Sequence, residues 1–126
     1  MDKKVVKTSE IRIQIGLNAD KMPVSLSWET EGQEGGKAQD SKALLLSFFD
    51  RQSKDTLKID LWTVDMQVAE MDRFFFQTLR SLADTYFRAT QNKELAADMQ
   101  RFVQYFGEKR RSFLSDVGSL QGIRIA

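Results

Sequence analysis

The chain has 126 residues, a formal net charge of +1, 41% hydrophobic and 29% charged residues, and a single proline. This composition is typical of one folded globular domain, and a net charge near zero gives no field for attracting nucleic acid or anionic lipid. The chain has no cysteine and no histidine, which excludes disulfides, Cys/His zinc sites, thiolate nucleophiles and imidazole bases.

The first ten residues, MDKKVVKTSE, contain lysines but no apolar segment of the kind found in a signal peptide. No later window approaches the length of a membrane span. We therefore expect a cytoplasmic protein that does not insert into a membrane and does not bind nucleic acid.

Two segments near the start alternate apolar and polar residues, as half-buried strands do: residues 10–17 (EIRIQIGL) and residues 24–28. The stretch between them, NADKMP, is rich in turn-forming residues, so we predict an antiparallel hairpin. A third alternating run, over residues 57–61, predicts a third strand.

Residues 29–37 (ETEGQEGGK) have no periodicity and predict a mobile loop. The apolar run that follows, residues 43–49, predicts a short helix with Asp40 or Ser41 as its N-cap. This helix would connect the second predicted strand to the third.

Two longer helices are predicted beyond the third strand. Thr63 or Asp65 would cap the first, and Asn92 would cap the second, in which Gly107 marks a weak point or an early end. Their predicted core positions, spaced by threes and fours, are Val68, Met71, Phe75, Leu79, Leu82 and Tyr86 in the first helix and Leu95, Met99, Phe102, Val103, Phe106 and Phe113 in the second.

The predicted element order is thus β-β-α-β-α-α in an α+β fold. A three-stranded, largely antiparallel sheet would carry the helices on one face. We expect one domain over residues 1–113 and a tail over residues 114–126, because Ser115 and Gly118 interrupt the helical pattern there.

Two aromatic residues do not fit these core patterns. On a helical wheel Phe74 lies off the apolar arc that is centred on Phe75 and extended by Phe76. Trp62 lies on the opposite side of its strand from Ile59, so the simple alternation points it outward. Trp62 and Phe74 are therefore the candidate protein-interface residues.

Four acids lie close together in the sequence around the junction of the third strand and the long helix: Asp60, Asp65, Glu70 and Asp72. They could form an acid/base site or bind a hard cation such as Mg²⁺. Acids are also common at helix N-termini, and these four lack the spacing of a recognised metal-binding loop. We favour the helix-terminus interpretation and expect no catalytic residue, metal or cofactor.

The run DTLKIDLWTVDM, residues 55–66, and the helix after it, VAEMDRFFFQTLRSLADTYFRAT, resemble the gliding motility-associated protein GldC family of the Bacteroidota. The stretches EIRIQIGLNADKMPVSLSWE, SKALLLSFFD and MQRFVQYFGEK support the resemblance, which covers residues 8–110. Gln67 departs from the family pattern, where a proline would be expected at the helix start, and residues 112–126 extend past the usual end.

The resemblance implies a small cytoplasmic accessory protein of the gliding apparatus, with no established catalytic activity or cofactor. We therefore expect a non-enzymatic module that binds one or more proteins of the gliding or secretion machinery and can form a homo-oligomer. The alternative is a small ligand-binding or carboxylate-based enzyme domain whose site lies among the four acids.

Overall fold

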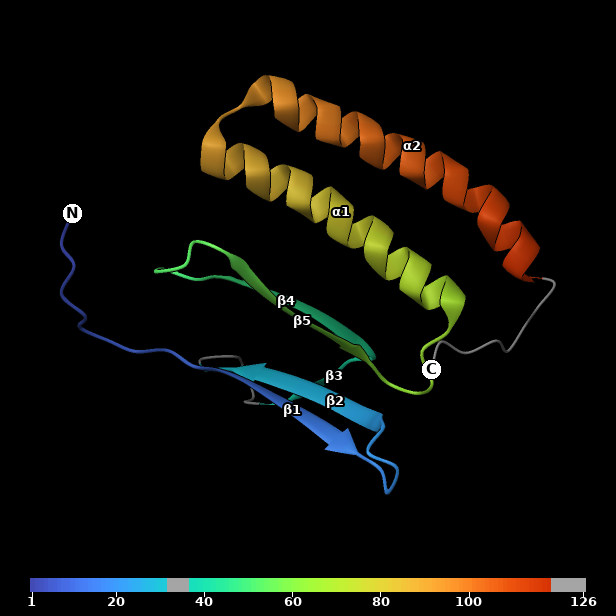
Figure 1. Ribbon diagram of the computed structural model, residues 1–126, viewed down its shortest axis with the longest axis horizontal. Helices are drawn as coiled ribbons and strands as arrows, with labels where there is room; N and C mark the ends of the chain where they lie inside the picture. The colour runs from blue at the N-terminus through green and yellow to red at the C-terminus, as the bar shows by residue number, and fades with distance from the viewer. Residues whose placement is uncertain (32–36, 119–126) are drawn as a thin grey trace. The chain divides into compact units, whose positions relative to one another are not determined.

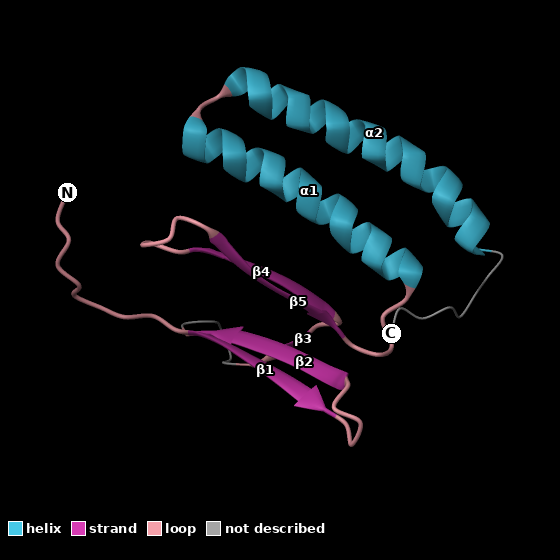
Figure 2. Cartoon of the chain, viewed as in Figure 1, coloured by secondary structure: helices cyan, strands magenta, loops and turns pink. Residues whose placement is uncertain are grey.

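The computed structural model describes residues 1–31 and 37–118, which form two compact units (Figure 1). The first unit, residues 1–66, contains the strands, and the second, which begins at Gln67, contains two helices (Figure 2). The α+β class is confirmed. The described strands form one sheet of three and one of two, which corrects the predicted single three-stranded sheet. The packing of helices on a sheet stays a prediction.

The predicted hairpin is confirmed. Strand β1, Ile11–Leu17, pairs antiparallel with β2, Pro23–Thr30. Asn18 builds the turn between them, since its side-chain oxygen accepts hydrogen bonds from the backbone N–H groups of Asp20 (2.9 Å) and Met22 (3.1 Å). Of the predicted loop, residues 29 and 30 belong to β2, and residues 32–36 lie outside the described residues.

The helix predicted over residues 43–49 is wrong. These residues form strand β4, Ala43–Phe49, which pairs antiparallel with β5, Thr56–Trp62, the third strand that the alternation predicted. The predicted N-caps therefore cap nothing: Asp40 lies in the short strand β3, Gln39–Asp40, and Ser41 follows it. The periodicity of a short apolar run does not distinguish a helix from a strand. Here the residues form a strand because they pair with side chains of β5.

A backbone hydrogen bond joins the two sheets within the first unit. The N–H of Val64, just after β5, donates to the carbonyl of Pro23 in β2 (3.0 Å), and the N–H of Ser41 continues the β2–β3 ladder by donating to the carbonyl of Leu26 (2.8 Å). Leu26 and Met66 are buried beside this junction, as is Thr63, whose relative exposure is 2%. The junction is therefore the best-buried part of the unit.

Helix α1, Val68–Thr90, begins later than predicted, and its N-cap is Gln67 rather than Thr63 or Asp65. The carboxylate of Glu70 accepts a hydrogen bond from the N–H of Gln67 (3.0 Å), which is half of a capping box. Thr63 and Asp65 instead form part of the preceding turn, in which the N–H of Met66 donates to the carbonyl of Thr63 (3.0 Å).

Helix α2, Lys93–Gly118, begins after Asn92, whose side-chain oxygen accepts a hydrogen bond from the N–H of Leu95 (3.1 Å). The predicted cap is thus confirmed. The helix neither ends at Gly107 nor breaks at Ser115, because it continues to Gly118. The rest of the predicted tail, residues 119–126, lies outside the described residues.

Candidate functional site

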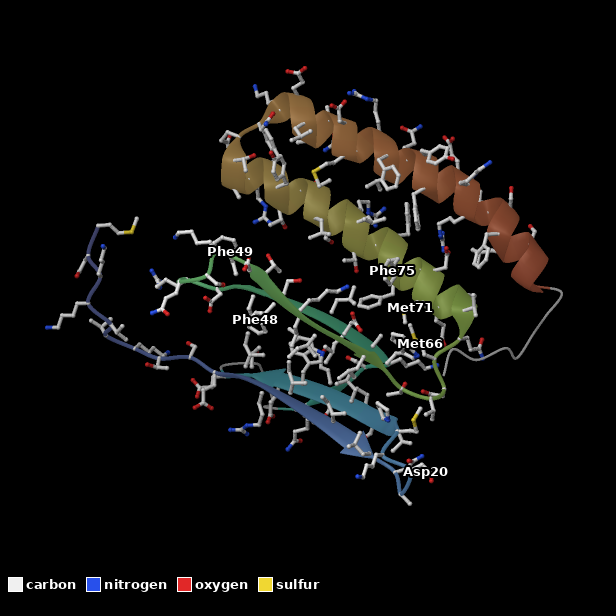
Figure 3. All side chains as sticks on the ribbon, in the orientation of Figure 1. Asp20, Phe48, Phe49, Met66, Met71 and Phe75 are labelled. Carbon is white, nitrogen blue, oxygen red and sulfur yellow. The ribbon has the colours of Figure 1, made fainter. Side chains whose placement is uncertain are left out.

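One face of the β4–β5 hairpin is entirely apolar. The register places Leu44 opposite Leu61, Leu46 opposite Ile59, and Phe48 opposite Leu57, and we call these six side chains the β4–β5 apolar face. Phe48, Leu57 and Ile59 are 54%, 59% and 51% exposed. Phe48 is labelled in Figure 3. A contiguous exposed patch of this kind is characteristic of a binding surface.

The opposite face of the same hairpin is mixed, with four polar side chains, Ser47, Thr56, Lys58 and Asp60, and four apolar ones, Ala43, Leu45, Phe49 and Trp62. Ser47 lies opposite Lys58 there, and Leu45 lies opposite Asp60. The Lys58 ammonium and the Asp60 carboxylate form an exposed ion pair (3.3 Å). The two faces of the hairpin therefore differ, because one is wholly apolar and the other carries all the polar side chains of the two strands.

Trp62 lies on the mixed face of the hairpin, opposite Ala43 and on the other face from Leu61, as the alternation predicted. Its side chain is half-buried. Trp62 is therefore only partly available as an interface residue, and its binding role stays a prediction.

Phe74 is also half-buried, and its ring packs edge-on against that of Phe75, with the two centroids 6.4 Å apart. Phe75 is 42% exposed (Figure 3), although the helical wheel placed it at the centre of the core arc. Within the helical unit, it is Phe76 rather than Phe75 that makes the aromatic contact between the two helices, because its ring stacks on that of Phe106. A wheel gives the direction of each side chain but does not say which flank the neighbouring helix covers.

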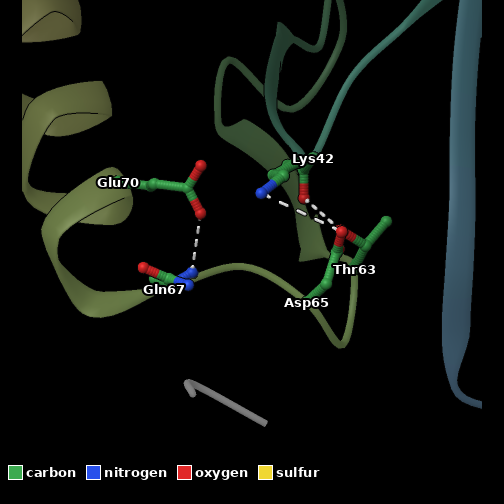
Figure 4. A network of polar contacts seen from close by, with 5 residues as sticks. All are labelled: Lys42, Thr63, Asp65, Gln67 and Glu70. Carbon is green, nitrogen blue, oxygen red and sulfur yellow. Dashed lines mark hydrogen bonds and ion pairs between the residues drawn. The ribbon is translucent and has the colours of Figure 1, made fainter. Parts of the chain in front are cut away.

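Two of the four predicted acids lie in the first unit, and each has its own partner. Asp60 pairs with Lys58. Asp65 accepts a hydrogen bond from the hydroxyl of Thr63 (2.5 Å) and lies 3.9 Å from the ammonium of Lys42 (Figure 4). These two carboxylates therefore serve separate local contacts.

The other two acids lie in the helical unit. Glu70 accepts the hydrogen bond from Gln67 at the start of α1 (Figure 4), as the helix-terminus interpretation predicted. Asp72 accepts a hydrogen bond from the guanidinium of Arg110 on α2 (2.5 Å). In the part of the chain that the structure describes, no three acidic side chains converge to hold a metal ion.

The Asp72–Arg110 pair belongs to a helix–helix cluster that the apolar spacing of the two helices does not predict. The two side chains are only 10% and 18% exposed, and the guanidinium lies 5.1 Å from the centroid of the Phe76 ring. Asp72 and Arg110 are equally far in sequence from Gln91, as are Phe76 and Phe106. Residues equidistant from the short turn of an antiparallel helix pair face each other, so this symmetry could have revealed the cluster.

A cavity of about 450 Å³ opens at the sheet junction of the first unit. Its polar lining comes from Ser25, Asp40, Ser41, Lys42, Thr63 and Asp65. Asp65 is the one member of the predicted acidic cluster that lines it, so the cavity does not gather those acids.

A model of the gliding motility-associated protein GldC-like family matches residues 23–112. Searches of curated proteins and of solved structures found no match. Neither helix that the structure describes is long and apolar enough to cross a membrane. Because the family match covers most of the sequence and includes residues 55–90, which carried the resemblance, the chain belongs to the GldC-like family of gliding motility-associated proteins.

Proposed function

We propose that the protein is a non-enzymatic accessory of the gliding or secretion apparatus that acts in the cytoplasm by binding another protein. Membership of the GldC-like family supports the connection with gliding motility. The observation that carries the binding role is the β4–β5 apolar face, with three of its six side chains more than half exposed.

The chemistry of this face suits a protein partner. Aliphatic and aromatic side chains at the centre of an interface supply most of its binding free energy once water is excluded from them. Phe48 and Leu57 form an adjacent cross-strand pair, so one partner side chain can contact both. Trp62 and Phe74 are proposed as secondary contacts only, because each side chain is half-buried and offers a partner just part of its surface.

The test uses a matched pair of double variants. Phe48→Ser with Leu57→Ser removes one opposed pair from the apolar face, and Ser47→Ala with Lys58→Gln alters the adjacent opposed pair on the mixed face. Each variant serves as bait in a lysate of a gliding bacterium, and the captured proteins are quantified by mass spectrometry. Loss of two anchors should reduce capture by about 30-fold, while the control should capture as the native protein does.

Thermal melting of both variants decides how to interpret a loss of capture. If the apolar-face variant keeps its melting temperature and its captured proteins, this face is not the binding surface. If its melting temperature falls steeply while that of the control does not, the face is covered within the folded chain, and the proposed binding role is wrong.

The alternative, a ligand-binding or carboxylate-based site among Asp60, Asp65, Glu70 and Asp72, has weaker support. The four carboxylates have different partners. The cavity at the sheet junction is the feature that favours it, and only Asp65 of the four lines that cavity.

A further inference from the structure

Strand β1 lies at the edge of the three-stranded sheet. In the order β1-β2-β3, β1 pairs only with β2 among the strands that the structure describes (Figure 2). The outer side of an edge strand presents backbone N–H and C=O groups that can pair with another chain.

Two backbone hydrogen bonds identify the residues of β1 whose polar groups point outward. Glu31 donates its N–H to the carbonyl of Glu10 (3.3 Å), so the hydrogen-bonded pairs of the hairpin fall on even-numbered residues of β1. Leu26, which lies opposite Ile15, directs its carbonyl away from β1 to the N–H of Ser41 (2.8 Å). The odd-numbered residues of β1 therefore direct their N–H and C=O groups to the open edge.

We propose that two copies of this chain pair through β1 in antiparallel orientation, with Ile13 on the two-fold axis. Ile11 then lies opposite Ile15 of the second copy, and the outward groups of these residues form about six hydrogen bonds. The three-stranded sheets of the two copies then join into one continuous sheet. This inference goes beyond the proposed function, which concerns strands β4 and β5.

The strand is self-complementary in this register. A two-fold axis perpendicular to a sheet keeps each face on its own side, so Ile11, Ile13 and Ile15 continue one apolar face into the second copy. On the other face Arg12 lies opposite Gln14 of the second copy, and no like charges meet.

The edge has little protection against such pairing. Its one charged residue, Arg12, already contacts Glu29 (3.1 Å) and Glu10 (3.6 Å) of its own chain. The β1–β2 register shifts between Gly16 and Leu17, which limits the regular edge to the residues before it. Centring the pair on Ile13 uses only that regular segment. Ile11 is 73% exposed, so pairing also removes apolar surface from water.

The first test is the oligomeric state of the full chain by sedimentation equilibrium. Ile13→Pro removes the outward N–H of each copy, and hence two hydrogen bonds at the axis, without removing a bond to β2. The dimer should weaken by about tenfold to a hundredfold. The control is Thr56→Pro: the N–H of Asp50 donates to the carbonyl of Asp55 (2.9 Å), so the N–H of Thr56 points away from β4. This control should leave the association constant unchanged.

The second test does not depend on a proline. The chain has no cysteine, so Ile13→Cys introduces a single thiol that faces its own copy across the axis. Hydrogen-bonded residues of antiparallel strands have Cα atoms about 5.5 Å apart, within the range that a disulfide spans. Mild oxidation should give a covalent dimer with Ile13→Cys and not with Thr56→Cys. A native protein that is monomeric at all accessible concentrations, or a dimer that Ile13→Cys does not cross-link, overturns the proposal.

Discussion

Phe74, Phe75 and Phe76 are consecutive in α1 and have three different surroundings. The ring of Phe76 stacks on Phe106 with nearly parallel planes (4°) and lies beneath the guanidinium of Arg110. Phe75 is 42% exposed, and Phe74 touches it edge-on. Each residue rotates about 100° around the helix axis, so only one of three neighbours can face the partner helix squarely.

The three residues should therefore differ in their contribution to stability. Phe76→Ala should lower the free energy of unfolding by about 3 kcal/mol, because it removes both the stacking and the cation contact. Phe75→Ala and Phe74→Ser should each cost about 1 kcal/mol. Urea denaturation followed by circular dichroism measures all three. If Phe75→Ala costs as much as Phe76→Ala, Phe75 is a core residue, as the helical wheel predicted.

At the scale of elements, local pattern predicted some boundaries well and others badly. The β1–β2 hairpin, strand β5, both long helices and the Asn92 cap follow from alternation, helical spacing and turn chemistry. Strand β4 does not, because its sequence, ALLLSFF, fits a buried helix as well as a strand, and the choice depends on partners in β5 that lie later in the chain. Helix α1 begins later than local pattern predicts because its N-cap, Gln67, is not a favoured N-cap residue.

The candidate site could be predicted only in part. The face of β5 on which Trp62 lies follows from strand alternation, and the role of Glu70 at the helix start follows from the preference for acids there. The β4–β5 apolar face does not, because it requires the register between two strands, one of which reads as a helix. The Asp72–Arg110 pair likewise requires the register of α1 on α2.

Gly107 shows how close the two helices approach. A Cβ at this position would lie 2.8 Å from Cε1 of Phe76 and 3.1 Å from its Cζ. In a helix interior, replacing glycine by alanine ordinarily stabilises by about 1 kcal/mol. Here the Phe76 ring is confined by Phe106 and Arg110, so overpacking of about 1–3 kcal/mol should outweigh that gain.

We therefore expect Gly107→Ala to lower the melting temperature. The matched control is Ser112→Ala, an exposed position of the same helix that should be neutral or slightly stabilising. A higher melting temperature for Gly107→Ala would mean that the Phe76 ring moves aside at little cost, and that the helices are less tightly packed at this point.

The turn between β4 and β5 should be sensitive to acid. The carboxylate of Asp50 accepts hydrogen bonds from the N–H groups of Ser53 (2.8 Å) and Gln52 (3.2 Å), and these donors, Ser53 above all, hold the pKa of Asp50 below its usual value. A carboxyl whose pKa is lower in the folded chain stabilises the fold above its unfolded pKa. That contribution is lost as the pH falls from about 4 through the lower folded pKa.

Asp50→Asn tests this contribution, because the amide oxygen still accepts hydrogen bonds but does not titrate in this range. The difference in stability between the native protein and this variant, measured by urea denaturation from neutral to acid pH, should shrink as the pH falls below about 4. A difference that stays constant with pH would show that the Asp50 charge does not stabilise the turn.

At the scale of the whole molecule, the kinds of polar side chain and their positions argue against a fold that needs a bound metal ion. The sequence supplies no imidazole and no thiolate, which are the ligands of structural zinc. Carboxylates remain, yet Asp60, Asp65, Glu70 and Asp72 each contact a different group of the chain. A hard cation would need several of these oxygens at one point.

We therefore expect the melting temperature to be the same in EDTA and in millimolar Mg²⁺ or Ca²⁺, as differential scanning calorimetry can show. A bound cation would stabilise the folded chain in proportion to the logarithm of its concentration, so even a weak site gives a graded rise. Asp65→Asn distinguishes a site from a general salt effect, because Asp65 lines the cavity at the sheet junction. If Mg²⁺ raises the melting temperature of the native chain and not that of Asp65→Asn, a carboxylate site exists at that junction, and the ligand-binding alternative replaces the non-enzymatic one.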